Sequence, residues 1–94
     1  MRNYQRKKYR IPNNAYKAAK SVIADYERLS KAKKGTVLRA AVECALNVVP
    51  KEYRKGVMGR LVRDDRFPLD ASMDTYYLWC ARFIREVAKQ LDMI

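Results

Sequence analysis

The spacing of apolar residues between positions 73 and 91 restricts the fold of this chain more than any other feature. At about 100° per residue, one arc of this segment collects apolar side chains and the opposite arc collects mostly polar ones. The apolar arc contains Met73, Tyr76, Tyr77, Trp79, Cys80, Ala81, Phe83, Ile84, Val87, Ala88 and Leu91. The pattern predicts a long amphipathic helix, with Ser72 as its N-cap and Asp74 near the positive end of the helix dipole.

Three more helices are predicted before this one. The first covers about residues 15–33, capped by Asn13 or Asn14, and its apolar residues recur at helical spacing. The second covers residues 37–48 and is apolar on almost every side, so we expect it to be the central helix.

The boundaries of the second and third helices follow from turn and cap residues. Gly35 is suited to the end of one helix and Thr36 to the N-cap of the next. Pro50 separates residues 37–48 from a third helix over about residues 51–62. In that third helix Gly56 and Gly59 would permit a close crossing with another helix.

These helices, with no alternating strand pattern of useful length, predict an all-α, small four-helix fold. A chain of 94 residues with 49% hydrophobic residues is enough for one core, so we expect one domain over residues 1–94. It would comprise a basic arm (1–12), a first helix (13–34) and a body (36–94) that ends in a helix-turn-helix-like pair.

The positive charge of the chain predicts a polyanionic partner. Basic residues number 21 against 10 acidic ones, giving a net charge of +11, and 11 of the basic residues fall within the first 35 positions. We expect double-stranded DNA, ahead of RNA or a membrane surface. The arm residues expected to bind phosphates are Arg2, Arg6, Lys7, Lys8 and Arg10. The alternative is a solvated tail that only aids solubility.

The sequence offers little for catalysis or metal binding. It has no histidine, and its two cysteines, Cys44 and Cys80, lie in apolar helical patterns, so we expect both in the core. Asp64 and Asp65 lie among arginines, which is typical of a solvated turn, with a magnesium-dependent nuclease as a remote alternative. We predict a non-enzymatic protein without cofactor or metal. Without an apolar run of membrane-spanning length or a signal peptide, we expect a cytoplasmic protein that does not bind membranes.

The last two predicted helices suggest how DNA would be bound. A recognition helix presents short side chains where its N-terminus meets the major groove, and longer cationic ones toward the phosphates. The first group would be Ser72, Asp74, Thr75 and Leu78, and the second Arg82, Arg85 and Lys89. The alternative is that this face is an ordinary solvated surface.

Three stretches of the chain resemble a known family. The segments IPNNAYKAAKSVIADYERLS, ALNVVPKEYRKGV and FPLDASMDTYYLWCARFIREVAKQLDMI are similar to phage RinA/ArpU-like transcriptional regulators, which in turn resemble region 4 of sigma-70 factors. The resemblance implies that Trp79, Phe83 and Val87 pack in the core. It also implies that Ser72, Thr75 and Arg82 lie where the recognition helix meets DNA.

Together these observations predict a phage- or prophage-type DNA-binding transcriptional regulator. The alternative is a small basic interaction module that binds RNA polymerase or another host protein. Whether the chain acts as a homodimer is left open by the sequence.

Overall fold

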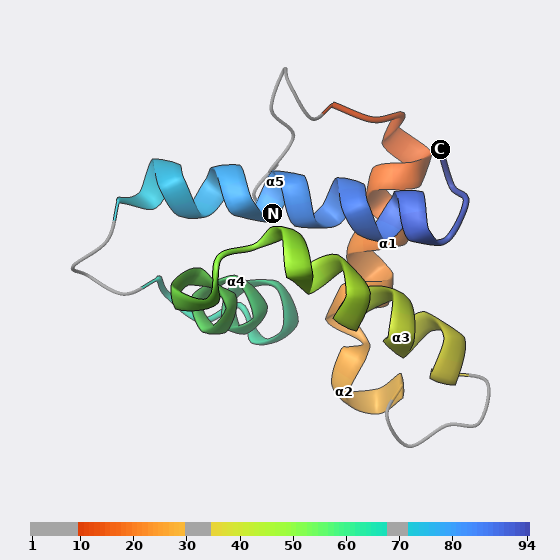
Figure 1. Cartoon of the computed structure of the whole chain (residues 1–94), viewed down its shortest axis with the longest axis horizontal. Helices are drawn as coiled ribbons and strands as arrows, with labels where there is room; N and C mark the ends of the chain where they lie inside the picture. The colour runs from red at the N-terminus through yellow and green to blue at the C-terminus, as the bar shows by residue number, and fades with distance from the viewer. Residues whose placement is uncertain (1–9, 30–34, 68–71) are drawn as a thin grey trace.

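The computed structural model is a bundle of α-helices (Figure 1). It describes residues 10–29, 35–67 and 72–94. The helices are α1 (Asn13–Ala24), α2 (Tyr26–Leu29), α3 (Gly35–Ala45), α4 (Lys51–Arg63) and α5 (Met73–Gln90), and a short 3₁₀ turn, η2 (Leu46–Val48), follows α3. No β-strand occurs within those three ranges, and the all-α prediction is confirmed.

Helix α5 is the centre of the bundle. It packs against α1, α3, α4 and η2. Figure 1 shows it lying along the length of the molecule, with α3 and α4 on one side and α1 crossing behind. Its buried side chains are Tyr76, Cys80, Ala81, Phe83, Ile84, Val87 and Ala88. Full burial of a side chain as large as Phe83 or Ile84 contributes about 1.5–3 kcal/mol, and α5 supplies more buried side chains to the core than any other described helix.

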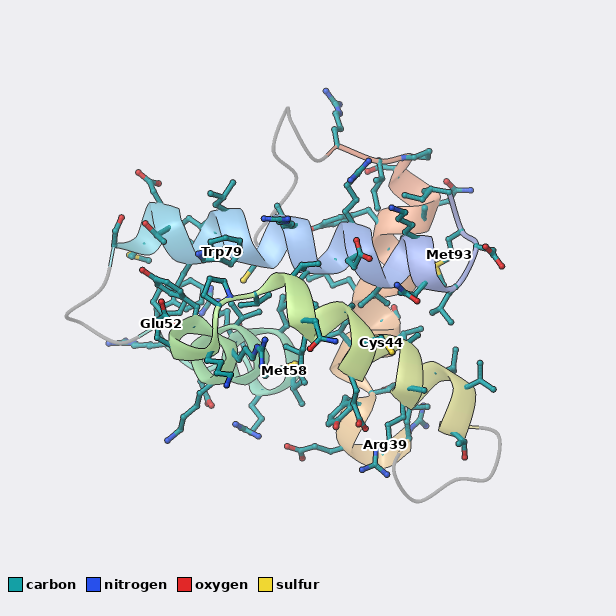
Figure 2. The ribbon with its side chains drawn as sticks, in the orientation of Figure 1. Arg39, Cys44, Glu52, Met58, Trp79 and Met93 are labelled. Atoms are coloured by element: carbon teal, nitrogen blue, oxygen red, sulfur yellow. The ribbon has the colours of Figure 1, made fainter. Side chains whose placement is uncertain are left out.

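The prediction that residues 37–48 form the central helix is wrong. Val37 on α3 is 72% exposed, and Ala40 and Cys44 are exposed as well; Figure 2 labels Cys44 on this helix. The prediction of a core position therefore fails for Cys44, whereas Cys80 is buried as expected. Small side chains lose little when they face water, so the apolar pattern of α3 overstated how many of its faces are covered.

The first predicted helix is divided at Asp25. Helix α1 ends at Ala24, and Asp25 has φ −89° and ψ 5°, away from regular helical values. Helix α2 then packs against α3, whereas α1 lies against α5. The hydroxyl of Tyr26 donates a hydrogen bond to the Glu43 carboxylate at 3.3 Å. The turn at Asp25 lets two consecutive segments reach different partners, and the rest of the predicted helix, residues 30–34, lies outside the described residues.

The helix starts agree only partly with the predicted caps. Pro12 occupies the N-cap of α1, while Asn14 lies inside the first turn, where its Oδ1 accepts a hydrogen bond from the Ala15 N–H at 3.0 Å. Thr36 is not a cap, because α3 already begins at Gly35. Pro50 does mark the boundary before α4, as predicted.

Helices α4 and α5 cross closely at a glycine. A Cβ atom built on Gly56 would lie 2.5 Å from Cε1 of Tyr76, so only glycine fits this position without displacement of the ring. Tyr76 is buried and its ring stacks on Phe67 with 4.6 Å between centroids. In Figure 1 α4 is seen nearly end-on beside α5, so the two helices cross rather than run side by side.

Candidate nucleic-acid interface

The candidate interface is the outer face of α5, the side opposite its buried residues. At about 100° per residue, the predicted site residues Asp74, Thr75, Leu78, Arg82, Arg85 and Lys89 all fall in one arc of this helix, and none of them is buried. We call this set the outer stripe. It extends about 22 Å along α5 at 1.5 Å per residue.

The N-terminal end of the outer stripe lies at the start of α5. Ser72 takes the N-cap position with φ −65° and ψ 125°, but its side chain makes no capping hydrogen bond. The position of the cap was predicted correctly. Asp74 lies in the first turn, where its carboxylate complements the helix dipole. The hydroxyl of Ser72 is exposed and can therefore meet a ligand at this end of the helix.

The middle of the outer stripe is occupied by Arg82. Its guanidinium carbon lies 5.6 Å from the centroid of the Trp79 ring, within the distance of a cation–π interaction. Trp79 in turn contacts Tyr53 of α4 with 6.2 Å between ring centroids. Figure 2 shows Trp79 on the side of α5 that faces α4. Arg82 thus lies against an aromatic surface built from two helices.

The C-terminal half of the outer stripe carries two more cations. Neither Arg85 nor Lys89 forms an ion pair with another residue in the described ranges. The neighbouring acid on this helix, Glu86, accepts a hydrogen bond from the Gln90 amide at 3.3 Å. Both cations are therefore available for an external anion.

Several arginines elsewhere are already neutralised by carboxylates. Arg28 pairs with Asp25 at 2.8 Å, and Arg39 pairs with Glu43 at 2.7 Å. At the end of α4, Arg63 contacts both Glu27 at 2.6 Å and Asp65 at 3.2 Å. These pairs lie on α2, α3 and α4, so much of the acidic charge is held away from the outer stripe.

The adjacent acids Asp64 and Asp65 belong to the turn that ends α4. Asp64 adopts a left-handed conformation with φ 58°, and its N–H donates to the carbonyl of Arg60 at 3.0 Å. Its carboxylate lies 3.5 Å from the Arg60 guanidinium. The two acids therefore sit in the charge-balanced turn that was predicted. Within the described ranges, no group of His, Cys, Asp or Glu is arranged to hold a metal ion.

Of the basic residues predicted for the arm, the structure describes only Arg10. Arg10 is exposed, while Arg2, Arg6, Lys7 and Lys8 lie outside the described residues. Ile11 next to it is buried and fixes the start of α1 to the core. In Figure 1 the chain runs into α1 on the side of α5 that is turned away from α3 and α4.

Two ionisable groups are perturbed by burial, and neither belongs to the predicted site. Burial lowers the pKa of Lys20, and the nearby positive charge of Arg60 adds to this effect. Burial raises the pKa of the Cys80 thiol to about 12, so Cys80 remains a neutral core thiol and not a nucleophile.

Sequence reasoning placed Trp79 in the core and missed its contact with Arg82. Trp79 is only half-buried, at the border between the buried face and the outer stripe. The separation of three residues could have indicated the contact, because i and i+3 side chains are neighbours on a helix.

Comparisons with protein families, characterised proteins and solved structures gave no match to this chain. The resemblance to RinA/ArpU-like regulators therefore stays a prediction from sequence motifs. In the part of the chain that the structure describes, no helix is both long enough and apolar enough to cross a membrane.

Proposed function

We propose that this protein binds double-stranded DNA through the outer stripe of α5 and regulates transcription as a helix-turn-helix-like protein. The main observation in support is that one face of α5, the longest described helix, presents Arg82, Arg85 and Lys89 in a row, opposite the face that forms the core. A single α-helix fits the major groove of B-DNA. The net charge of +11 supplies the long-range attraction to phosphates.

Ser72 and the residues of the outer stripe divide into two roles under this proposal. Ser72, Asp74, Thr75 and Leu78 would meet base edges where the N-terminus of α5 approaches the groove. A carboxylate such as that of Asp74 accepts from the cytosine amino group, and Thr75 or Leu78 contacts a thymine methyl group. Arg82, Arg85 and Lys89, together with the basic arm, would bind phosphates. Because phosphate contacts carry no sequence information, specificity would depend on the first group.

The crossing of α4 and α5 supports the helix-turn-helix interpretation. In such motifs one helix crosses the DNA backbone while the following helix lies in the groove. Here residues 64–72 join the two helices, a longer connection than the three or four residues of the usual motif. The resemblance to RinA/ArpU-like regulators favours the same interpretation.

Salt-dependent binding of the purified chain to a random-sequence DNA duplex tests the proposal. Each cation that contacts a phosphate should reduce the slope of log K against log salt by about 0.9 when it is replaced by alanine. We expect this for Arg85→Ala and Lys89→Ala. Arg39 is an exposed cation on α3 that pairs with Glu43 at 2.7 Å, and Arg39→Ala serves as the matched control that leaves the slope unchanged. Equal slopes for all three variants would exclude the outer stripe as the phosphate-binding face.

Selection of bound fragments from random duplex DNA separates specific from nonspecific binding. A consensus that changes in Thr75→Ala but not in Lys89→Ala would support base contacts at the start of α5. A palindromic consensus would indicate a homodimer. Absence of DNA binding, with capture of RNA polymerase instead, would favour the interaction-module alternative.

A further inference from the structure

Trp79 is an aromatic residue of α5 to which the proposed DNA contacts assign no role. It lies between the buried face and the outer stripe, and its Nε1 atom is covered by the protein. The Tyr53 ring of α4, tilted by 34° at 6.2 Å, packs against it. Tyr53 is itself held edge-on by Tyr76, with 5.1 Å between centroids. The indole is thus fixed by packing from two helices.

The position of Arg82 against this fixed indole has consequences for binding. An arginine side chain carries about 2 kcal/mol of rotamer entropy, part of which is lost when it contacts a ligand. A guanidinium that already lies 5.6 Å from the Trp79 centroid has fewer conformations to lose. A guanidinium carries five N–H donors in one plane, a geometry suited to two acceptor oxygens or to an oxygen and a ring nitrogen.

We propose that Trp79 is a positioning residue that holds the Arg82 guanidinium ready for a paired acceptor on DNA. This inference rests on the proposed DNA binding and adds to it the residue that orients one contact. The acceptor is either a phosphate or the O6/N7 edge of guanine, which present similar pairs of acceptors to a guanidinium. Lysine cannot replace Arg82 in this role, because an ammonium group lacks the planar set of donors.

A double-mutant cycle with random-sequence duplex DNA tests the inference by fluorescence anisotropy. We expect Arg82→Ala to weaken binding by about 5- to 150-fold. Trp79→Leu keeps an apolar side chain but removes the aromatic face, and should weaken binding by about 2- to 5-fold. In the Arg82→Ala background, Trp79→Leu should have no further effect. Lys89→Ala provides the matched control, because Trp79→Leu should still weaken binding to its full extent in that background.

Conservative variants keep the inference testable if Trp79→Leu fails to fold. Trp79→Phe retains a ring and should bind nearly as well as the parent. Arg82→Lys retains the charge and the salt dependence, but should lose about as much affinity as Trp79→Leu. If Arg82→Lys binds like the parent, the planar guanidinium is not required and the inference is overturned.

The remaining outcomes distinguish this inference from the proposed function. If the parent binds DNA and Trp79→Leu weakens binding equally in all backgrounds, Trp79 acts through the fold and not through Arg82, so only the inference fails. If the parent does not bind duplex DNA, both fail. Where coupling is observed, a smaller salt slope in Arg82→Ala identifies a phosphate, and a lost guanine preference identifies a base.

Discussion

Two alanine substitutions in α4, three residues apart, should change stability in opposite directions. Both replace a glycine in a helix, and alanine is favoured there by about 1 kcal/mol. At Gly56 the added Cβ would lie 2.5 Å from Cε1 and 3.0 Å from Cζ of Tyr76. That ring cannot rotate away freely, because it is buried and stacked on Phe67 at 4.6 Å. Overpacking of this kind costs about 1–3 kcal/mol.

At Gly59 the new Cβ meets one tight contact, and that contact is with a movable group. Oδ2 of Asp65, the end of an exposed side chain, lies at 3.1 Å, whereas Cβ of Asp65 at 3.6 Å and Nη2 of Arg63 at 3.7 Å are at ordinary van der Waals distances. We therefore expect Gly59→Ala to be more stable than the parent by up to about 1 kcal/mol. Gly56→Ala should be less stable by up to about 2 kcal/mol, which is the overpacking cost minus the gain in helix propensity.

Thermal and urea denaturation followed by circular dichroism measure this difference. For a domain of this size, 1 kcal/mol corresponds to about 4–8 °C in Tm, so the two variants should melt on opposite sides of the parent. Equal melting temperatures for both variants would show that α4 and α5 do not cross closely at Gly56. A lowered Tm for Gly59→Ala alone would show that the turn at Asp64 and Asp65 is less adaptable than its exposure implies.

Three other predictions concern the arm, the cysteines and the core. Deletion of residues 1–10, which removes five basic side chains, should make the slope of log K against log salt shallower by up to about 4.5; an unchanged slope would mean that the arm binds no phosphate. A thiol reagent at about pH 8 should modify Cys44 in the native protein, and Cys80 only after denaturation. Burial raises the pKa of the Cys80 thiol from 9.0 to about 12, so the unfolded state loses the thiol proton at a lower pH than the folded state. The contribution of this thiol to the free energy of unfolding is therefore complete below about pH 9 and declines as the pH rises toward 12. Urea titrations of Cys80→Ala should lack this decline. Phe83→Ala should lower the free energy of unfolding by about 3–5 kcal/mol, whereas Val37→Ala, at an exposed position, should change it by less than about 0.5 kcal/mol.

Helix boundaries could be predicted where the local sequence pattern was strong. The expected end of α5 differs by one residue from the observed one, because large apolar side chains recur with helical period over five turns and Ser72 and Asp74 mark the start. The boundary at Pro50 is equally local, since proline restricts the residue before it and has no N–H to donate. The turn at Asp25 was not predictable in this way, because the helical pattern continues through it and only the packing of α2 on α3 explains the bend.

The candidate site was predictable as a face but not as a set of contacts. Helical geometry alone puts Thr75, Arg82 and Lys89 on the side opposite Ile84. The aromatic surface beneath Arg82 depends on Tyr53, which is distant in sequence and reaches Trp79 only through the crossing of α4 and α5. For the same reason the exposure of Cys44 escaped prediction, since it depends on which faces of α3 the other helices cover.

The central place of α5 also bears on how the chain folds as it is synthesised. Helices α1, α3 and α4 leave the ribosome before α5, although each of them packs against it. Until α5 has been made, buried residues such as Ile23, Val42 and Val57 lack a principal packing partner. Contacts between α1 and α5 join positions far apart in sequence, and such contacts slow folding because a long loop must close first. Nascent chains that stall before Met73 should therefore remain unfolded, dependent on chaperones and open to proteases.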